Sequence, residues 1–166
     1  MKKNLLLLTL ILFTTLSFCQ TGKYWTLNVE RKENITKDKS VARQSFPKEF
    51  KLFHLNIDLV KNNLFSIVGN KASHSTVISL PNADGNIELF EVFEASNFEA
   101  DLQAQFPEIR AFSGKGITDK YATLKLSISP QGIQTMIFRS DKGSEFIEPY
   151  SQDHSIYAVF KSQRNK

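Results

Sequence analysis

The chain has few cysteines and histidines, the residues that most often ligate zinc. Its 166 residues include one cysteine and three histidines, which stand far apart at His54, His74 and His154. Disulfides need cysteine pairs, and zinc sites bring Cys and His side chains together at short, regular spacings. The motifs H-E-x-x-H and G-x-S-x-G and the phosphate-binding loop are also absent. The sequence therefore predicts no disulfide framework, no metal site, no cofactor and no catalytic residues, which argues against an enzyme.

The N-terminus carries a long apolar run. Lys2 and Lys3 precede an apolar stretch over residues 5–16, and small residues stand at positions 17 and 19. This order is typical of a secretory signal peptide, and the run is short for a membrane span. We expect cleavage before Gln20, so that residues 1–19 are the signal peptide. The remainder is then exported to the periplasm or the extracellular space, with no membrane attachment.

A second interpretation of the same segment is a lipoprotein signal. Residues 16–19 resemble a lipobox, in which Cys19 would carry lipid as the first residue of the mature chain. Phe18 is bulky at a position where such boxes have Gly, Ala or Ser, which favours the simple signal peptide. In that case the exported chain contains no cysteine at all.

The exported chain has little net charge. Removing residues 1–19 leaves 147 residues (166 minus 19), and the loss of Lys2 and Lys3 lowers the formal charge from +4 to +2. The remaining Lys and Arg are scattered, without the aromatic platform that binders of single-stranded nucleic acid use. A nucleic-acid partner is therefore not expected, and the length suits one domain.

The first part of the exported chain, residues 20–49, is expected to be mostly irregular. Residues 24–29 alternate apolar and polar, which predicts a strand with Trp25, Leu27 and Val29 on one face. Residues 30–48 are polar and basic, which is typical of a long loop. An α+β domain over residues 50–166 follows, and it opens with a strand and a helical turn capped by Asp58.

The clearest local signals lie in the middle of the chain. Two apolar strands flank a turn over residues 81–86, where Asp-Gly supplies the backbone angles of a hairpin. Ser96 and Glu99 then have the spacing of a helix capping box, and apolar residues recur every four positions at Phe98, Leu102 and Phe106. These patterns predict a hairpin, a short helix with its apolar side toward the core, and one more strand.

Two further hairpins are expected over residues 121–138 and 145–160. Each has apolar residues alternating with polar ones on both sides of a turn. The sum is a β-rich α+β domain, in which antiparallel hairpins form a sheet of seven or eight strands with one or two short helices on one side.

Acidic residues gather in the central stretch. Seven acids occur from residue 84 to residue 108, and no Lys or Arg stands between the first and the last of them. One interpretation is a solvated outer face, which is ordinary for a half-exposed sheet and helix. The other is a contact surface for a basic or metal-bearing partner, made by Glu88, Glu91, Glu94, Glu99 and Asp101.

Five pieces of the chain, in this order, resemble one known family. They are FKLFHLNIDLVKNNL, VISLPNADGNIELFEVFEAS, LQAQFPEIRAFSGKGITD, ATLKLSISPQGIQTMIF and FIEPYSQDHSIYAVF. The run from residue 50 to residue 160 looks like the N-terminal propeptide region of secreted bacterial reprolysin-like zinc metalloproteases. The resemblance implies a pro-domain that helps its protease to fold and masks the active site until it is cut away.

The sequence stops at Lys166 without a zinc-binding helix, so the zinc metalloprotease catalytic domain would be a partner in cis or in trans. Three explanations stay open: a pro-region separated from its protease, a free-standing secreted peptidase inhibitor or chaperone, and an envelope- or glycan-binding module of similar fold. If the domain masks zinc, an Asp or Glu oxygen on an exposed loop is a suitable ligand. Asp119 and Asp153 are the candidates, although an exposed loop Asp is more often a turn residue.

Overall fold

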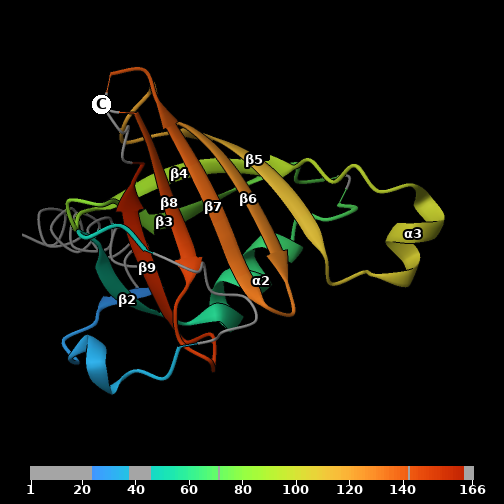
Figure 1. Cartoon of the computed structure of the whole chain (residues 1–166). Coiled ribbons are helices and arrows are strands. Elements are labelled where there is room, and N and C mark those ends of the chain that lie inside the picture. The colour runs from blue at the N-terminus through green and yellow to red at the C-terminus, as the bar shows by residue number, and fades with distance from the viewer. Residues whose placement is uncertain (1–23, 38–45, 71, 142, 163–166) are drawn as a thin grey trace, which may run out of the picture.

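The structure is a computed structural model, and it describes residues 24–37, 46–70, 72–141 and 143–162. The expected signal peptide, its cleavage site and Cys19 lie outside the described residues. Within the described part, nine antiparallel strands form one sheet in the order β1-β2-β9-β8-β7-β6-β5-β4-β3, and the sheet is strongly curled (Figure 1). The β-rich, antiparallel character predicted from the sequence is confirmed, with more strands than expected.

The strands follow the alternation of the sequence closely. Their bounds are β1 (Trp25–Leu27), β2 (Lys51–Leu55), β3 (Ser75–Pro81), β4 (Ile87–Glu94), β5 (Arg110–Gly116), β6 (Thr123–Ser129), β7 (Gly132–Arg139), β8 (Gly143–Pro149) and β9 (Ile156–Lys161). Among the described residues, three short helical segments accompany them: the 3-10 turn η2 (Lys32–Asn34), α2 (Ile57–Phe65) and α3 (Ala100–Gln105). The predicted α+β content is thus dominated by β structure.

The main core lies on the concave side of the sheet. Side chains from β2 through β9 meet there, and α2 packs into the same side with Val60 and Leu64 fully buried. Burying each such aliphatic side chain stabilises the fold by about 1.5–3 kcal/mol. The N-cap of α2 is Asn56, whose Oδ1 accepts from the Leu59 N–H at 3.3 Å, and not Asp58 as the sequence suggested. Asn56 stands one residue before the first helical residue, where a cap belongs.

The curl brings the two ends of the sheet together. Trp25 on β1 donates its indole N–H to the Ser79 carbonyl on β3 at 2.8 Å, although these strands are the first and last of the sheet order. Two residues before Ser79, the Val77 carbonyl on the same edge of β3 accepts from the side-chain amide of Asn63 of α2 at 2.9 Å. Pro81 ends β3 without an N–H. The edge of β3 is therefore partly satisfied, which limits pairing with another chain.

A second, smaller core covers the convex side of β2, β9 and β8. It is made by Ile35, Leu52, Tyr150, Ile156, Ala158 and Phe160, with Phe46 and Phe50 packed against them. Lys32 stands over the Phe50 ring at 3.6 Å. The described parts of the expected loop, residues 30–37 and 46–48, thus contribute to a packed layer on the convex side. Just before this segment, the Asn28 N–H donates to the Leu52 carbonyl at 2.9 Å.

The predicted strand over residues 24–29, with Trp25, Leu27 and Val29 on one face, is found only for residues 25–27. The strand ends at Leu27, and only Trp25 is buried, while Leu27 and Val29 are exposed. The chain leaves the sheet here to cross to the convex side, so the alternation ends before it can bury a second residue.

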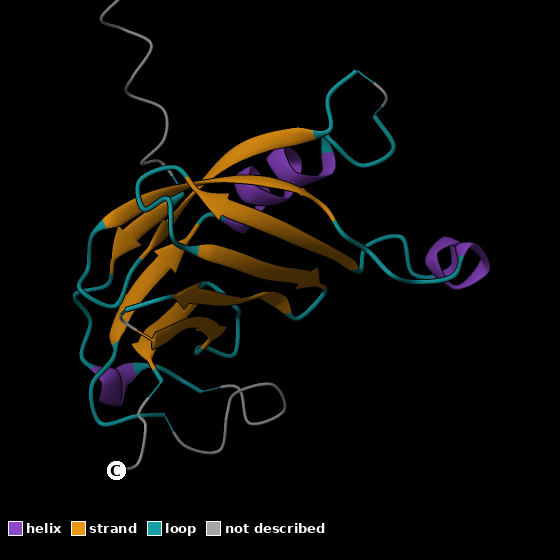
Figure 2. Ribbon diagram, turned by 90° about the horizontal axis from the view of Figure 1, so that it is seen from above, coloured by secondary structure: helices purple, strands orange, loops and turns teal. Residues whose placement is uncertain are grey.

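The short helix after β4 does not pack on the sheet. Residues 95–109, which we call the arm, leave β4, form α3 and return to β5, and they project from the body of the molecule (Figures 1 and 2). Leu102 and Phe106 were predicted to face the core, but they are 41% and 42% exposed, and α3 buries no residue. The predicted capping box is also absent, because Ser96 Oγ accepts from the Ala111 N–H at 3.1 Å instead of capping the helix.

Candidate functional site

The five acids of the expected contact surface do not share one face. Successive residues of a strand point to opposite sides of a sheet, so Glu88 and Glu94 on β4 face one way and Glu91 faces the other. Glu88 is buried on the concave side, and Glu94 forms an ion pair with Arg110 at 2.9 Å. Only Glu99 and Asp101, on the arm, are both exposed and close in sequence. Glu88 is therefore removed from the expected contact surface.

Glu88 belongs instead to a buried cluster around Arg139. The guanidinium of Arg139, whose side chain is 2% exposed, lies 2.5 Å from Glu88, 2.6 Å from Asp119 and 3.1 Å from Glu145. Burial alone would lower the pKa of Arg139, but the hydrogen bonds and charges of these carboxylates outweigh it and raise that pKa above its ordinary value. The arginine is therefore permanently charged, and the cluster holds β4, the β5–β6 loop, β7 and β8 together.

Further polar contacts link this cluster to the β3–β4 turn and to strands β9 and β2. Asn82 donates to Glu88 at 2.8 Å, and Lys161 at the end of β9 pairs with Asp84 at 2.9 Å. Lys51 on β2 donates to the Asp84 carbonyl. The β3–β4 turn is thereby tied to β9 and β2, so polar contacts close this end of the curled sheet.

The two aspartates proposed to block a zinc ion have structural roles in this fold. Asp119 bonds Arg139 through one oxygen and accepts from the Tyr121 N–H at 3.0 Å through the other. Asp153 accepts from the hydroxyl groups of Ser151 and Ser155, at 2.5 and 2.8 Å. The Ser151 bond is the main reason that the pKa of Asp153 lies below its usual value, and the Ser155 bonds add to it. Both carboxylates are occupied, Asp119 by Arg139 of β7 and by its own loop and Asp153 within its own loop, so the expectation that either one reaches into a cleft has no support from the geometry.

The arm presents an apolar ridge in place of the expected acidic sheet face. Phe98, Leu102 and Phe106 are each more than two-fifths exposed, and residues 95–109 contain three acids and no Lys or Arg. The three lie within nine residues of one projecting segment, and exposed apolar side chains gathered in this way mark contact sites more often than singly scattered ones do.

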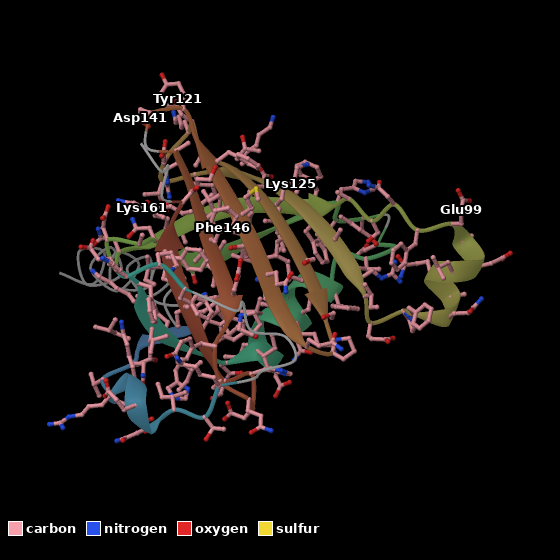
Figure 3. All side chains as sticks on the ribbon, in the orientation of Figure 1. Glu99, Tyr121, Lys125, Asp141, Phe146 and Lys161 are labelled. Carbon is pink, nitrogen blue, oxygen red and sulfur yellow. The ribbon has the colours of Figure 1, made fainter. Side chains whose placement is uncertain are left out.

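Polar bonds at its base hold the arm in shape. Gln103 donates to the carbonyls of Phe106 and Ile109 at 2.9 and 3.0 Å. Arg110, the first residue of β5, pairs with Glu94 and also donates to the Pro107 carbonyl at 3.1 Å. The arm is therefore a shaped projection, with Glu99 at the opposite side of the molecule from Lys161 (Figure 3).

Other site types find no support in the described part of the chain. No group of three or more His, Cys, Asp or Glu side chains there is placed to hold a metal ion. Among the same residues, no helix has the length and apolar character needed to cross a membrane.

Comparisons with known proteins leave the family open. No family model matches the chain, and neither the curated proteins nor the solved structures include a match. The propeptide resemblance therefore rests on the sequence pieces alone and stays a prediction.

Sequence patterns gave no direct signal for the Arg139 cluster. The partners of Arg139 lie 51, 20 and 6 residues away in the chain. One local signal was present: Arg139 and Glu145 occupy the inward positions of β7 and β8, in phase with Ile137 and Ile147. Two opposite charges in phase with buried aliphatic residues indicate an internal ion pair.

Proposed function

We propose that the chain is a secreted, non-catalytic, propeptide-like domain that assists the folding of a zinc metalloprotease and masks it by docking the arm. The observation that carries the proposal is the apolar ridge of Phe98, Leu102 and Phe106 on a projecting, internally braced segment. An exposed ridge of this kind suits insertion into a hydrophobic cleft, where large apolar side chains dominate binding energy. The sequence pieces that resemble protease propeptides name the kind of partner.

The masking works without a zinc ligand from this chain. Asp119 is paired with Arg139 of β7 and Asp153 is bonded within its own loop, so the proposed mask covers the cleft sterically and leaves the zinc coordinated by the protease alone. Glu99 and Asp101 flank the ridge and face solvent. They would attract a basic rim, which mainly speeds association and weakens as salt screens exposed charges.

The same surface would serve a free-standing peptidase inhibitor, the second candidate. The two differ in whether the protease follows on the same polypeptide, not in how the arm docks. An envelope- or glycan-binding role, the third possibility, does not use an apolar arm and would leave protease activity unchanged.

The test adds residues 20–166 in trans to a reprolysin-like catalytic domain from the same source and follows cleavage of a peptide substrate. We expect slower cleavage, and Phe106→Ser should weaken inhibition by about tenfold or more, since truncating a central apolar anchor costs about 2 kcal/mol or more. The matched control is Phe138→Ser, which removes an equally exposed phenylalanine (44% against 42%) from the sheet.

Two outcomes would contradict the proposal. Cleavage that proceeds unchanged at micromolar excess of the domain excludes masking and favours the envelope-binding role. If the domain inhibits the protease but Phe106→Ser and Phe138→Ser weaken that inhibition equally, the masking role stands and the arm is excluded as the contact surface.

A further inference from the structure

The convex side of the sheet has a hollow apart from the apolar ridge of the arm. It has a volume of about 650 Å³ and lies across β5, β6, β7 and β8, with the first residues of the arm at its rim. Two rows of paired residues line it, namely Ser113, Lys125, Met136 and Phe146 in one row and Ala111, Ser127 and Gln134 in the other. Ala111, Ser113 and Ser127 are small, whereas Lys125, Gln134, Met136 and Phe146 beside them are longer, and this difference in side-chain size produces the depression.

Lys125 on β6 is the cation among the lining residues of the hollow, and Glu148 on β8, two strands away, is the anion. Its Nζ donates to Ser113 Oγ at 2.7 Å, and Ser113 is itself buried, so the ammonium group is held at the wall (Figure 3 labels Lys125 and Phe146). An ammonium group has three N–H donors, which leaves two for a ligand. The ion pairs found among the described residues do not include Lys125.

Polar groups suited to a peptide backbone surround this cation. Asn97, Ser127 and Gln134 line the hollow, and their side chains form no hydrogen bond with any other residue that the structure describes. A side-chain amide both donates and accepts, as a peptide group does, so Asn97 and Gln134 match the needs of an extended segment. Met136 and Ala111 add apolar surface for its side chains.

We propose that the hollow binds an extended peptide segment through an acidic side chain, whose carboxylate sits on Lys125 while Gln134 and Asn97 bond the peptide backbone. A glycan is less well matched, because the aromatic ring at the hollow, Phe146, is half-buried and stacked on Phe160 at 5.6 Å and offers no open platform. This site is separate from the ridge of the arm and does not depend on the masking role.

The test uses two capped hexapeptides, Ser-Leu-Glu-Thr-Leu-Ser and the same peptide with Gln in place of Glu, added to the isotope-labelled chain of residues 20–166. In low salt the Glu peptide should shift the amide resonances of Ser127, Gln134 and Met136. The dissociation constant of the Glu peptide should be about fivefold lower than that of the Gln peptide, because one charge-assisted hydrogen bond at a solvated site provides about this difference.

Two variants make the test specific. Lys125→Met should abolish the preference for the Glu peptide over the Gln peptide. The dispersion of the amide resonances of this variant should match that of the parent chain, which shows that the fold is intact. Lys115→Met, the control, removes the same charge from the same face of the sheet on the neighbouring strand β5, but Lys115 stands opposite Glu91 and does not line the hollow. It should leave the preference unchanged.

Equal binding of the two peptides, an absence of binding, or an equal loss in both variants would overturn the proposal. So would binding of a galacturonic acid trisaccharide at these resonances without binding of the Glu peptide, since that result assigns the hollow to acidic glycans. The outcome is independent of protease masking, because the Lys125→Met chain should still inhibit and the Phe106→Ser chain should still bind the Glu peptide.

Discussion

One guanidinium joins segments that are far apart in the chain. Arg139 contacts Glu88, Asp119 and Glu145, which come from β4, the β5–β6 loop and β8. Removing a buried charge from water costs several kcal/mol, and the attraction of the partners offsets this only while every partner is present. The cluster therefore adds little net stability over an apolar core of equal size, but losing one member is costly.

Replacing Glu88 should consequently affect stability and not binding. We expect Glu88→Gln to lower the free energy of unfolding by roughly 1–3 kcal/mol, because Arg139 loses one of its charged acceptors. Glu91→Gln, three residues away on the exposed side of β4, should change it by less than about 0.5 kcal/mol. Urea unfolding of both variants checks this, and equal midpoints for the two would show that the cluster does not form in solution.

Tyr157 supplies a prediction at alkaline pH. Burial raises the pKa of Tyr157 to about 12, while the bond from the Ile133 N–H to its oxygen acts in the opposite direction. The unfolded value is about 10, so the contribution of the neutral phenol is fully present below about pH 10 and is lost as the pH rises toward 12.

Tyr157→Phe isolates this effect. Between about pH 9 and pH 11.5 the parent chain should lose more unfolding free energy than Tyr157→Phe, whose ring cannot ionise. Denaturant titrations at both pH values measure the difference. Parallel losses in the two chains would contradict the assigned burial of this phenol.

The two helices differ in what they pack against, and this difference decides what their residues contribute. Leu64 in α2 is fully buried in the main core, whereas Leu102 in α3 is partly exposed on the arm. Both helices carry apolar residues at helical spacing. Only α2 is placed where the sheet curls around it.

We expect Leu64→Ala to cost about 2–5 kcal/mol of unfolding free energy, because it leaves a cavity that the core fills only in part. Leu102→Ala should cost less than about 1 kcal/mol, since much of its surface is already in water. Urea midpoints at unchanged slope measure both values. A Leu102→Ala cost as large as that of Leu64→Ala would place α3 against the sheet after all.

As a whole, the molecule is a curled sheet closed at one end by α2 and at the other by the polar contacts around Arg139 and Asp84. The arm is the segment that departs from this body (Figure 2). A projecting segment with exposed apolar side chains is what the proposed masking role requires.

Catalysis by the chain alone is not expected. Residues 20–166 should show no hydrolysis of casein or of peptide substrates, with or without added zinc, because the sequence contains neither a zinc-binding motif nor a nucleophile motif. The measurement is release of labelled fragments by a preparation free of host proteases. Zinc-dependent cleavage that a chelator abolishes would contradict the prediction.

The sequence by itself determined the elements whose signals are local. Strict alternation around Pro130-Gln131-Gly132 specifies the β6–β7 hairpin, and the Asp84-Gly85 turn specifies β3–β4. Side chains two positions apart share one face of a strand, so alternation also indicates which residues of β6 and β7 are buried. These features need only neighbours along the chain, and each of them was predictable.

Only the tertiary structure decided where the elements stand and which charges meet. Phe98, Leu102 and Phe106 have the spacing of a core-facing helix, but the spacing does not supply a surface to pack on, and the β4–β5 connection carries α3 away from the sheet. Likewise, Glu88 and Glu91 look equivalent in the sequence. Glu88 is paired with Arg139, 51 residues further on, whereas Glu91 lies on the exposed face and accepts from the Ser75 hydroxyl. Burial and pairing of this kind depend on the curl of the whole sheet, and no local pattern encodes that curl.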